Sequence, residues 1–174
     1  MVSRVHDMEL NACFDGIRRG NMDDFERVYH ELKTPVYTIA LRITGNRWLA
    51  EDLLQEFFVR LYQSPPESVR KPRAYLFQTI RNLAIDALRE KSGEISTEGA
   101  PEEQLLERYL IRMDLEIAIR RLELLERQIV VLHLNGGLKF REVAEILDLP
   151  LGTVYARYRK AIGRLRDMLD GGMI

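Results

Sequence analysis

Apolar residues recur at spacings of three and four along nearly all of the 174 residues, and this repeat constrains the fold more than any other feature. Such spacing places apolar side chains on one face of an α-helix, whereas a half-buried strand needs alternating apolar and polar residues. We find no convincing alternating stretch bounded by turns. The sequence therefore predicts an all-α protein.

Proline and glycine divide this pattern into separate helices. Pro35 and Pro72 stand at positions typical of a helix start, Gly45 at a helix end, and the pair Pro65-Pro66 forbids continuation. The signals together predict nine helices, near residues 8–19, 22–33, 35–43, 47–62, 72–90, 102–122, 125–134, 140–147 and 153–169.

Residues 92–101 are small and polar and contain few large apolar side chains, so this stretch contributes little to a packed core. We interpret it as a flexible linker. It separates two predicted helical domains, at residues 8–91 and 102–170. A chain of this length is compatible with two small domains.

The overall composition excludes several classes of function. Lys plus Arg is 26 and Asp plus Glu is 27, so the net charge of −1 offers no global attraction to nucleic acid, and any basic surface must be local. The single cysteine, Cys13, excludes an internal disulfide framework, and with only three scattered histidines the chain lacks a zinc site of the usual spacing. We predict no metal and no other cofactor.

No apolar run approaches the roughly 18 residues that cross a bilayer, and the N-terminal residues lack the apolar core of a signal peptide. We therefore expect a cytoplasmic protein without membrane insertion. No glycine-rich phosphate loop, metal-ligand cluster or nucleophile–base motif is visible, so an enzyme ranks last among the functions considered.

Residues 140–166 have the pattern of a helix-turn-helix. Val143 and Ile146 form the inner face of a short helix, the segment from Asp148 to Pro150 breaks it, and Thr153 is a cap-capable residue before the next helix. Aspartate tolerates the left-handed backbone that such a turn requires. Between residues 151 and 166 there are five basic residues and no acid, which fits the major groove of DNA, although an ordinary solvated basic face is the alternative.

The predicted helix at 47–62 has an outer face that burial does not explain. Its apolar residues point to one broad side, and Asp52, Gln55, Glu56 and Val59 share the other. This outer face is either solvated surface or a docking site for a partner protein. Periodicity alone favours the first interpretation.

The predicted helix at 72–90 combines polar residues with local positive charge. It leaves a stripe at spacings of three and four, made of Tyr75, Gln78, Asn82, Asp86 and Arg89. Residues 70–91 hold six basic residues against two acids, which favours a polyanion. Aromatic rings beside such a patch are able to stack on unpaired bases.

Three motifs in this order resemble a known family. They are Ala50-Glu-Asp-Leu-Leu-Gln-Glu-Phe-Phe-Val-Arg-Leu-Tyr62, then Ala74-Tyr-Leu-Phe-Gln-Thr-Ile-Arg-Asn-Leu-Ala-Ile-Asp86, then the hairpin around Gly152-Thr-Val. The chain resembles a bacterial RNA polymerase sigma factor of the extracytoplasmic-function (ECF) group of the sigma-70 family. The resemblance implies that 8–91 is region 2 and 102–170 is region 4, joined by the linker.

The resemblance also implies roles for individual residues. Docking on the clamp helices of the largest polymerase subunit falls to Asp52, Gln55, Glu56 and Arg60. Contact with the minus 10 promoter element falls to Tyr75, Gln78, Arg81, Asn82 and Asp86. Contact with the minus 35 element falls to Thr153, Tyr155, Ala156, Arg157, Arg159 and Lys160.

The resemblance further implies three partners and a non-enzymatic function. The partners are core RNA polymerase, including the flap of its second-largest subunit, promoter DNA and an anti-sigma factor. Two rival interpretations remain open at this point. One is a helix-turn-helix transcription regulator that acts without polymerase, and the other is a sigma-like interaction protein that only titrates a regulator of sigma factors.

Overall fold

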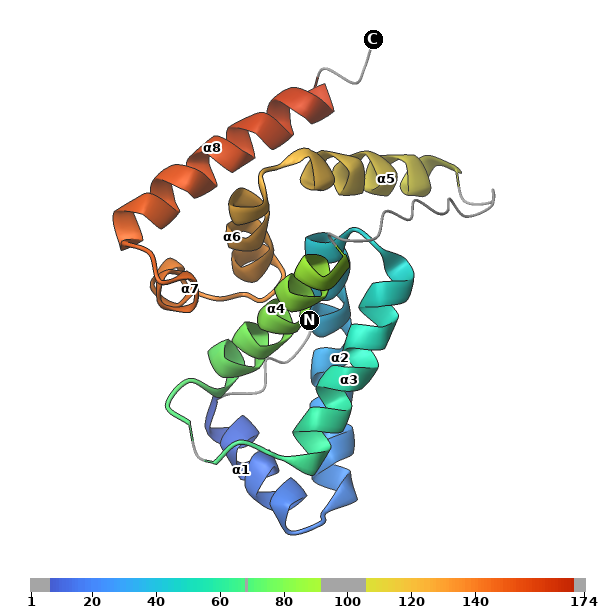
Figure 1. Cartoon of the computed structure of the whole chain (residues 1–174), viewed down its shortest axis with the longest axis vertical. Coiled ribbons are helices and arrows are strands. Elements are labelled where there is room, and N and C mark those ends of the chain that lie inside the picture. Colours follow the sequence, from blue (N-terminus) through green and yellow to red (C-terminus); the bar gives the residue numbers. More distant parts are fainter. Residues whose placement is uncertain (1–6, 68, 92–105, 171–174) are drawn as a thin grey trace.

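The chain folds into two groups of helices, as the computed structural model in Figure 1 shows. The model describes residues 7–67, 69–91 and 106–170. Within them the first module has the helices α1 (Asp7–Arg18), α2 (Met22–Thr44), α3 (Arg47–Gln63) and α4 (Pro72–Lys91). The second module has the helices α5 (Leu106–Arg121), α6 (Leu124–Leu134), α7 (Phe140–Leu147) and α8 (Leu151–Asp170). The all-α prediction is confirmed. The predicted linker at 92–101 lies outside the described residues.

In the first module, α2 packs against α1, α3 and α4. Asparagine side chains start two of these helices: Asn21 accepts a hydrogen bond from the Asp23 backbone N–H, and Asn46 accepts one from that of Leu49. Gly45 ends α2 with a left-handed backbone at φ 68°, as its position in the sequence predicts. The largest fully buried side chains of this module include Phe14, Leu32, Ile39, Phe57, Phe77 and Ile80.

The prediction of two helices at 22–33 and 35–43 is wrong, because α2 runs unbroken through Pro35. Proline inside a helix has no N–H for the carbonyl four residues earlier and costs on the order of 3 kcal/mol. On either side of it, Leu32 and Val36 are both fully buried in the core. Continuous burial of the apolar face on both sides of the proline offsets the missing hydrogen bond.

In the second module, α8 packs across α5, α6 and α7. Val143, Val154 and Leu165 are buried, as the helix-turn-helix pattern predicts. The turn between α7 and α8 depends on Asp148, whose φ of 52° is left-handed and whose N–H donates to carbonyls of the preceding turn. The predicted capping role of Thr153 is wrong, because α8 already begins at Leu151 and Thr153 lies in its first turn.

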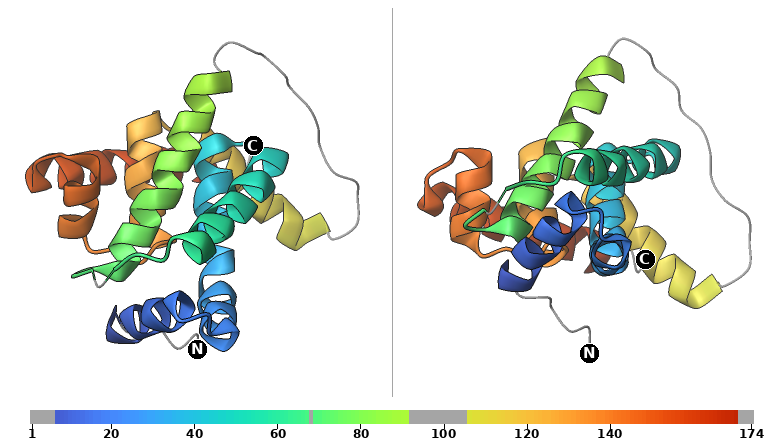
Figure 2. Two further views of the ribbon diagram at one scale, coloured as in Figure 1. Left: turned by 60° about the horizontal axis from the view of Figure 1, so that its bottom comes forward. Right: turned by 90° about the horizontal axis from the view of Figure 1, so that it is seen from below.

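The two modules pack against each other. In Figure 2, α4 lies between α3 and the helices α6 and α7, and α2 contacts α5 and α6 directly. Arg42 on α2 donates two hydrogen bonds to Glu116 on α5, at 3.0 and 2.8 Å, and one to Asn135 beyond α6, at 2.7 Å. Lys71, just before α4, pairs with Glu145 on α7 at 2.7 Å. Polar contacts therefore link the modules at two places, and the buried apolar residues of both modules belong to one hydrophobic core.

Candidate protein-binding and nucleic-acid-binding surfaces

The outer face of α3 is exposed as predicted. Leu53, Phe57 and Leu61 are buried against the rest of the first module. The opposite side therefore carries the predicted docking residues in solvent, namely Asp52, Gln55, Glu56 and Arg60. Glu56 and Arg60 form an ion pair one helical turn apart, whereas Asp52 has no ion-pair partner in the described ranges.

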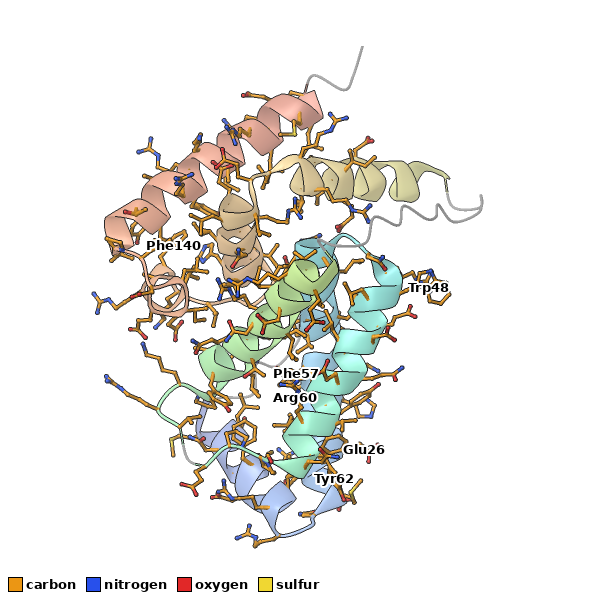
Figure 3. The ribbon with its side chains drawn as sticks, viewed as in Figure 1. Glu26, Trp48, Phe57, Arg60, Tyr62 and Phe140 are labelled. Carbon is orange, nitrogen blue, oxygen red and sulfur yellow. The ribbon has the colours of Figure 1, made fainter. Side chains whose placement is uncertain are left out.

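Exposed apolar side chains extend this face along α3. Trp48, the single tryptophan of the chain, is 71% exposed, and Val59 and Tyr62 are each about half exposed. Figure 3 shows Trp48 pointing away from the body of the protein near the start of α3. The sequence-based prediction identified Val59 but missed Trp48. One signal in the sequence would have added Trp48 to this face. It shares one side of the helix with Asp52, Gln55 and Val59, at spacings of four and three residues.

The predicted stripe on α4 is also exposed, while its neighbour Arg81 is not. Tyr75, Gln78, Asn82 and Asp86 are all exposed on one side of the helix. Arg81 is half-buried instead, and donates to Gln128 on α6 at 2.7 Å and to Asn82 at 2.9 Å. Burial, aided by the nearby Arg89 charge, lowers the pKa of the Arg81 guanidinium. In this arrangement of the modules Arg81 contacts the second module and is only partly exposed to solvent.

The segment before α4 is tied to both modules. Asn11 on α1 bonds the backbone of Val69 twice, donating to its carbonyl at 2.9 Å and accepting from its N–H at 3.2 Å. Lys71 makes its bidentate contact with Glu145, and this hydrogen bond is the main reason that the pKa of the Glu145 carboxyl lies below its usual range. Arg70, next to it, is exposed.

On α8 the predicted DNA-binding residues separate into two sides. Tyr155, Ala156 and Arg159 are exposed, and within the described part of the chain Arg159 has no acidic partner. Thr153 is partly exposed near the start of the helix. Phe140, at the start of α7, packs against Tyr155, with ring centroids 4.5 Å apart. This contact restrains an aromatic side chain that points outward from the helix.

The other side of α8 faces two acids at the start of α6. Arg157 donates to Glu123 at 3.1 Å, and the Lys160 ammonium lies 3.8 Å from Glu123 and 3.4 Å from Glu126. Lys160 remains half exposed. The sequence-based assignment counted Arg157 and Lys160 with the DNA-contacting residues, and it missed their inner contacts because the acids that hold them lie more than 30 positions away.

Three chemical features bear on other kinds of site. The described part of the chain holds no group of three or more His, Cys, Asp or Glu side chains arranged to bind a metal ion. Among the helices that the structure describes, none combines the length and apolarity that crossing a bilayer requires. Cys13 is buried, and burial raises the pKa of its thiol.

Two protein-family models match the chain. Sigma-70 region 2 matches residues 28–94, and Sigma-70 region 4 matches residues 112–165. The ECF RNA polymerase sigma factor SigW of Bacillus subtilis is 29% identical over 183 residues, covering 94% of this chain and 98% of that protein. SigE of Mycolicibacterium smegmatis, another ECF sigma factor, is 30% identical over 172 residues, covering 91% of this chain and 66% of that protein.

Two solved structures have a similar fold. The sigma factor RpoE from Bartonella quintana, in complex with the anti-sigma factor NepR, has a TM-score of 0.73 at 22% identity, covering 84% of this chain and 97% of that chain. CnrH, in complex with the cytosolic domain of CnrY, has a TM-score of 0.68 at 18% identity, covering 94% of this chain and 98% of that chain.

Proposed function

The chain belongs to the sigma-70 family of RNA polymerase sigma factors, in its ECF group, and we propose how its exposed surfaces share the task of directing polymerase to promoters. The outer face of α3 holds core polymerase, the stripe on α4 contacts the minus 10 element, and the outer side of α8 reads the minus 35 element. The chain itself is not an enzyme, and the polymerase supplies the catalysis.

The α3 face is proposed to dock on the clamp helices of the largest polymerase subunit. Asp52, Gln55, Glu56 and Arg60 offer hydrogen bonds and a free carboxylate, and Trp48 adds the large exposed aromatic area that is typical of interface anchors. The observation that carries the proposal is that these side chains stand in solvent on a helix whose other side is fully buried.

The α4 stripe is proposed to capture unpaired bases of the minus 10 element. Opening a duplex costs stacking of on the order of 1.4 kcal/mol per base-pair step, and aromatic rings offset this cost when bases stack on them. Tyr75 is the exposed ring on this stripe, and Gln78, Asn82 and Asp86 follow it at helical spacing. Arg81 joins them only when the contact with Gln128 is released.

The outer side of α8 is proposed to enter the major groove of the minus 35 element. Tyr155, Ala156 and Arg159 face outward at the positions where such a helix meets base edges, and Thr153 lies at its flank. Arg157 and Lys160 reach phosphates only when their contacts with Glu123 and Glu126 are released. When one module has bound its promoter element, the other module is held near the second element at a high effective concentration. Correctly spaced pairs of elements are therefore preferred over either element alone.

An anti-sigma factor is the third proposed partner. Support comes from RpoE of Bartonella quintana and from CnrH, which were solved with NepR and with the cytosolic domain of CnrY. Contact with the flap of the second-largest polymerase subunit is proposed for the second module by family resemblance. Because the chain is proposed to act together with RNA polymerase, we infer that it functions in the cytoplasm.

Charge reversal on α3 tests the docking proposal. The double substitution Asp52→Lys with Glu56→Lys should weaken binding of purified chain to core polymerase by at least about tenfold, because two interface acids become cations. The matched control is Glu67→Lys with Glu90→Lys, which reverses two exposed acids outside the α3 face. Circular dichroism verifies the fold of both variants. Equal affinity of wild type and the α3 variant would contradict the docking assignment.

A further inference from the structure

Three of the five basic residues of α8 contact acids of the second module and are only partly exposed. Arg157, Lys160 and Arg164 follow one another at spacings of three and four and therefore lie on one side of the helix. All three contact Glu123 and the last two also contact Glu126, at the start of α6. The two remaining cations, at positions 159 and 166, are exposed, and neither has an acidic partner among the residues that the structure describes.

Glu126 is the centre of this network. Its side chain is 0% exposed, its Oε2 accepts a hydrogen bond from Arg164 at 2.8 Å, and its Oε1 lies 3.4 Å from the Lys160 ammonium without accepting a hydrogen bond. Burying a carboxylate is costly, and a buried ion pair is often no more stabilising than well-packed apolar residues of similar volume. Stability alone therefore does not account for an acid at this position.

Glu123 completes the network at its solvent edge. Its carboxylate accepts from Arg157 at 3.1 Å and from Arg164 at 3.3 Å, and it is half exposed. The charge of Lys160, together with the hydrogen bond from Arg164, holds the pKa of Glu123 below its usual range. Glu123 is therefore charged at neutral pH and opposes the cations that face it.

We propose that Glu123 and Glu126 form an acid pair that determines the DNA specificity of α8. The inference rests on the proposed role of α8 in reading DNA. By holding Arg157, Lys160 and Arg164 inward, the acid pair fixes which side of the helix faces the groove and leaves Arg159 as the free cation at its centre. It also withholds cations from phosphates, and phosphate contacts raise affinity for every sequence equally.

A purely structural role for the acid pair makes a different prediction. If Glu123 and Glu126 only stabilise the second module, their amide variants lose stability, but the folded fraction keeps the salt dependence and sequence preference of the wild type. If they withhold cations from DNA, the folded variants bind non-specific DNA more tightly and discriminate less. The slope of log affinity against log salt steepens by about 1 for each cation that gains a phosphate.

The test uses the full chain bound to core polymerase. The variants are Glu123→Gln and Glu126→Gln, and the matched control is Asp167→Asn, which makes the same charge change at an exposed position of α8. One probe is a mixed-sequence duplex titrated at several salt concentrations. The other is a duplex library with a randomised upstream segment, from which each protein selects its preferred sequence.

We expect both glutamine variants to bind the mixed-sequence duplex with a slope steeper than the control by about 1. The ratio of selected to mixed-sequence affinity should fall roughly tenfold, the cost of about one lost base contact. Glu123→Asp keeps the charge and should restore the wild-type slope. Because Glu123 is half exposed, we expect its variants to remain folded. They therefore still test the proposal even if Glu126→Gln unfolds.

Two failures are distinguishable. Slopes and ratios equal to those of Asp167→Asn in both glutamine variants would overturn the inference about the acid pair. A wild-type holoenzyme that selects no upstream sequence at all would instead overturn the proposed function of α8.

Discussion

The outer faces of α3 and α8 are both charged, but they hold their charge in different ways. On α3 the acidic face stands in solvent, and the one ion pair among its predicted docking residues, Glu56 with Arg60, lies within the same helix. On α8 more than half of the basic residues are held by acids from another helix. A protein partner that docks by hydrogen bonds and apolar contact needs its surface uncovered, whereas a DNA reader gains selectivity when part of its charge is withheld.

Among the substitutions that test this comparison of α3 with α8, the largest effect is expected for Trp48. Trp48→Ala should weaken binding to core polymerase by about 2 kcal/mol, roughly thirtyfold, because an exposed tryptophan beside polar contacts has the character of an interface anchor. Met22→Ala, which trims another exposed apolar side chain at the start of α2, is the control and should leave this affinity unchanged. Fluorescence or surface-based titration with core polymerase measures both. Equal affinities would remove Trp48 from the interface.

Within α8, two adjacent alanine substitutions should differ. Arg159→Ala is expected to cost about 1.5 kcal/mol of promoter affinity, since its side chain is exposed and no described acid pairs with it. Lys160→Ala should cost less than about 0.5 kcal/mol, because the ammonium already contacts Glu123 and Glu126. Holoenzyme titrations on one promoter compare them directly. The reverse order of effects would contradict the assignment of outer and inner sides.

The fold and the α3 face were largely predictable because they depend on local pattern. Helical spacing predicted which residues of α3 and α4 are exposed, and Asp148 was placed correctly at the left-handed turn. The errors came from distant parts of the chain. Burial on both sides of Pro35 overrides its helix-breaking tendency, and the inward turn of Lys160 depends on acids of α6 that periodicity within α8 does not reveal. The partial burial of Arg81 likewise needs Gln128 from the other module.

The contact between the modules supplies a smaller effect. Arg42→Ala removes hydrogen bonds to Glu116 and Asn135 and should destabilise the packing of the second module on the first by about 1 kcal/mol. Small-angle X-ray scattering should show an increased radius of gyration. Arg89→Ala, which loses only an exposed pair with Asp86, is the control. An unchanged radius for Arg42→Ala would show that this residue does not hold the modules together.

The smallest effect is a dependence on pH. The folded-state pKa of Glu123 is depressed, so its contribution to stability is fully present above the ordinary carboxylate pKa of about 4.3 and is lost as pH falls through the lower folded value. Glu123→Gln should therefore lose part of this acid-range dependence of unfolding free energy, whereas Asp167→Asn should retain it. Urea titrations across the acid range measure both. Identical pH profiles would exclude the ion pairs of Glu123 as a source of stability.

Promoter-dependent transcription tests the central claim most directly. Purified chain, core RNA polymerase and genomic DNA fragments are combined in run-off reactions, with core alone as the reference. We predict transcripts from discrete start sites that require the chain and that disappear with the Asp52→Lys, Glu56→Lys variant. The same transcripts from core alone, or undiminished transcripts with that variant, would contradict the account. The account requires α3 to bind core polymerase while α4 and α8 contact promoter DNA.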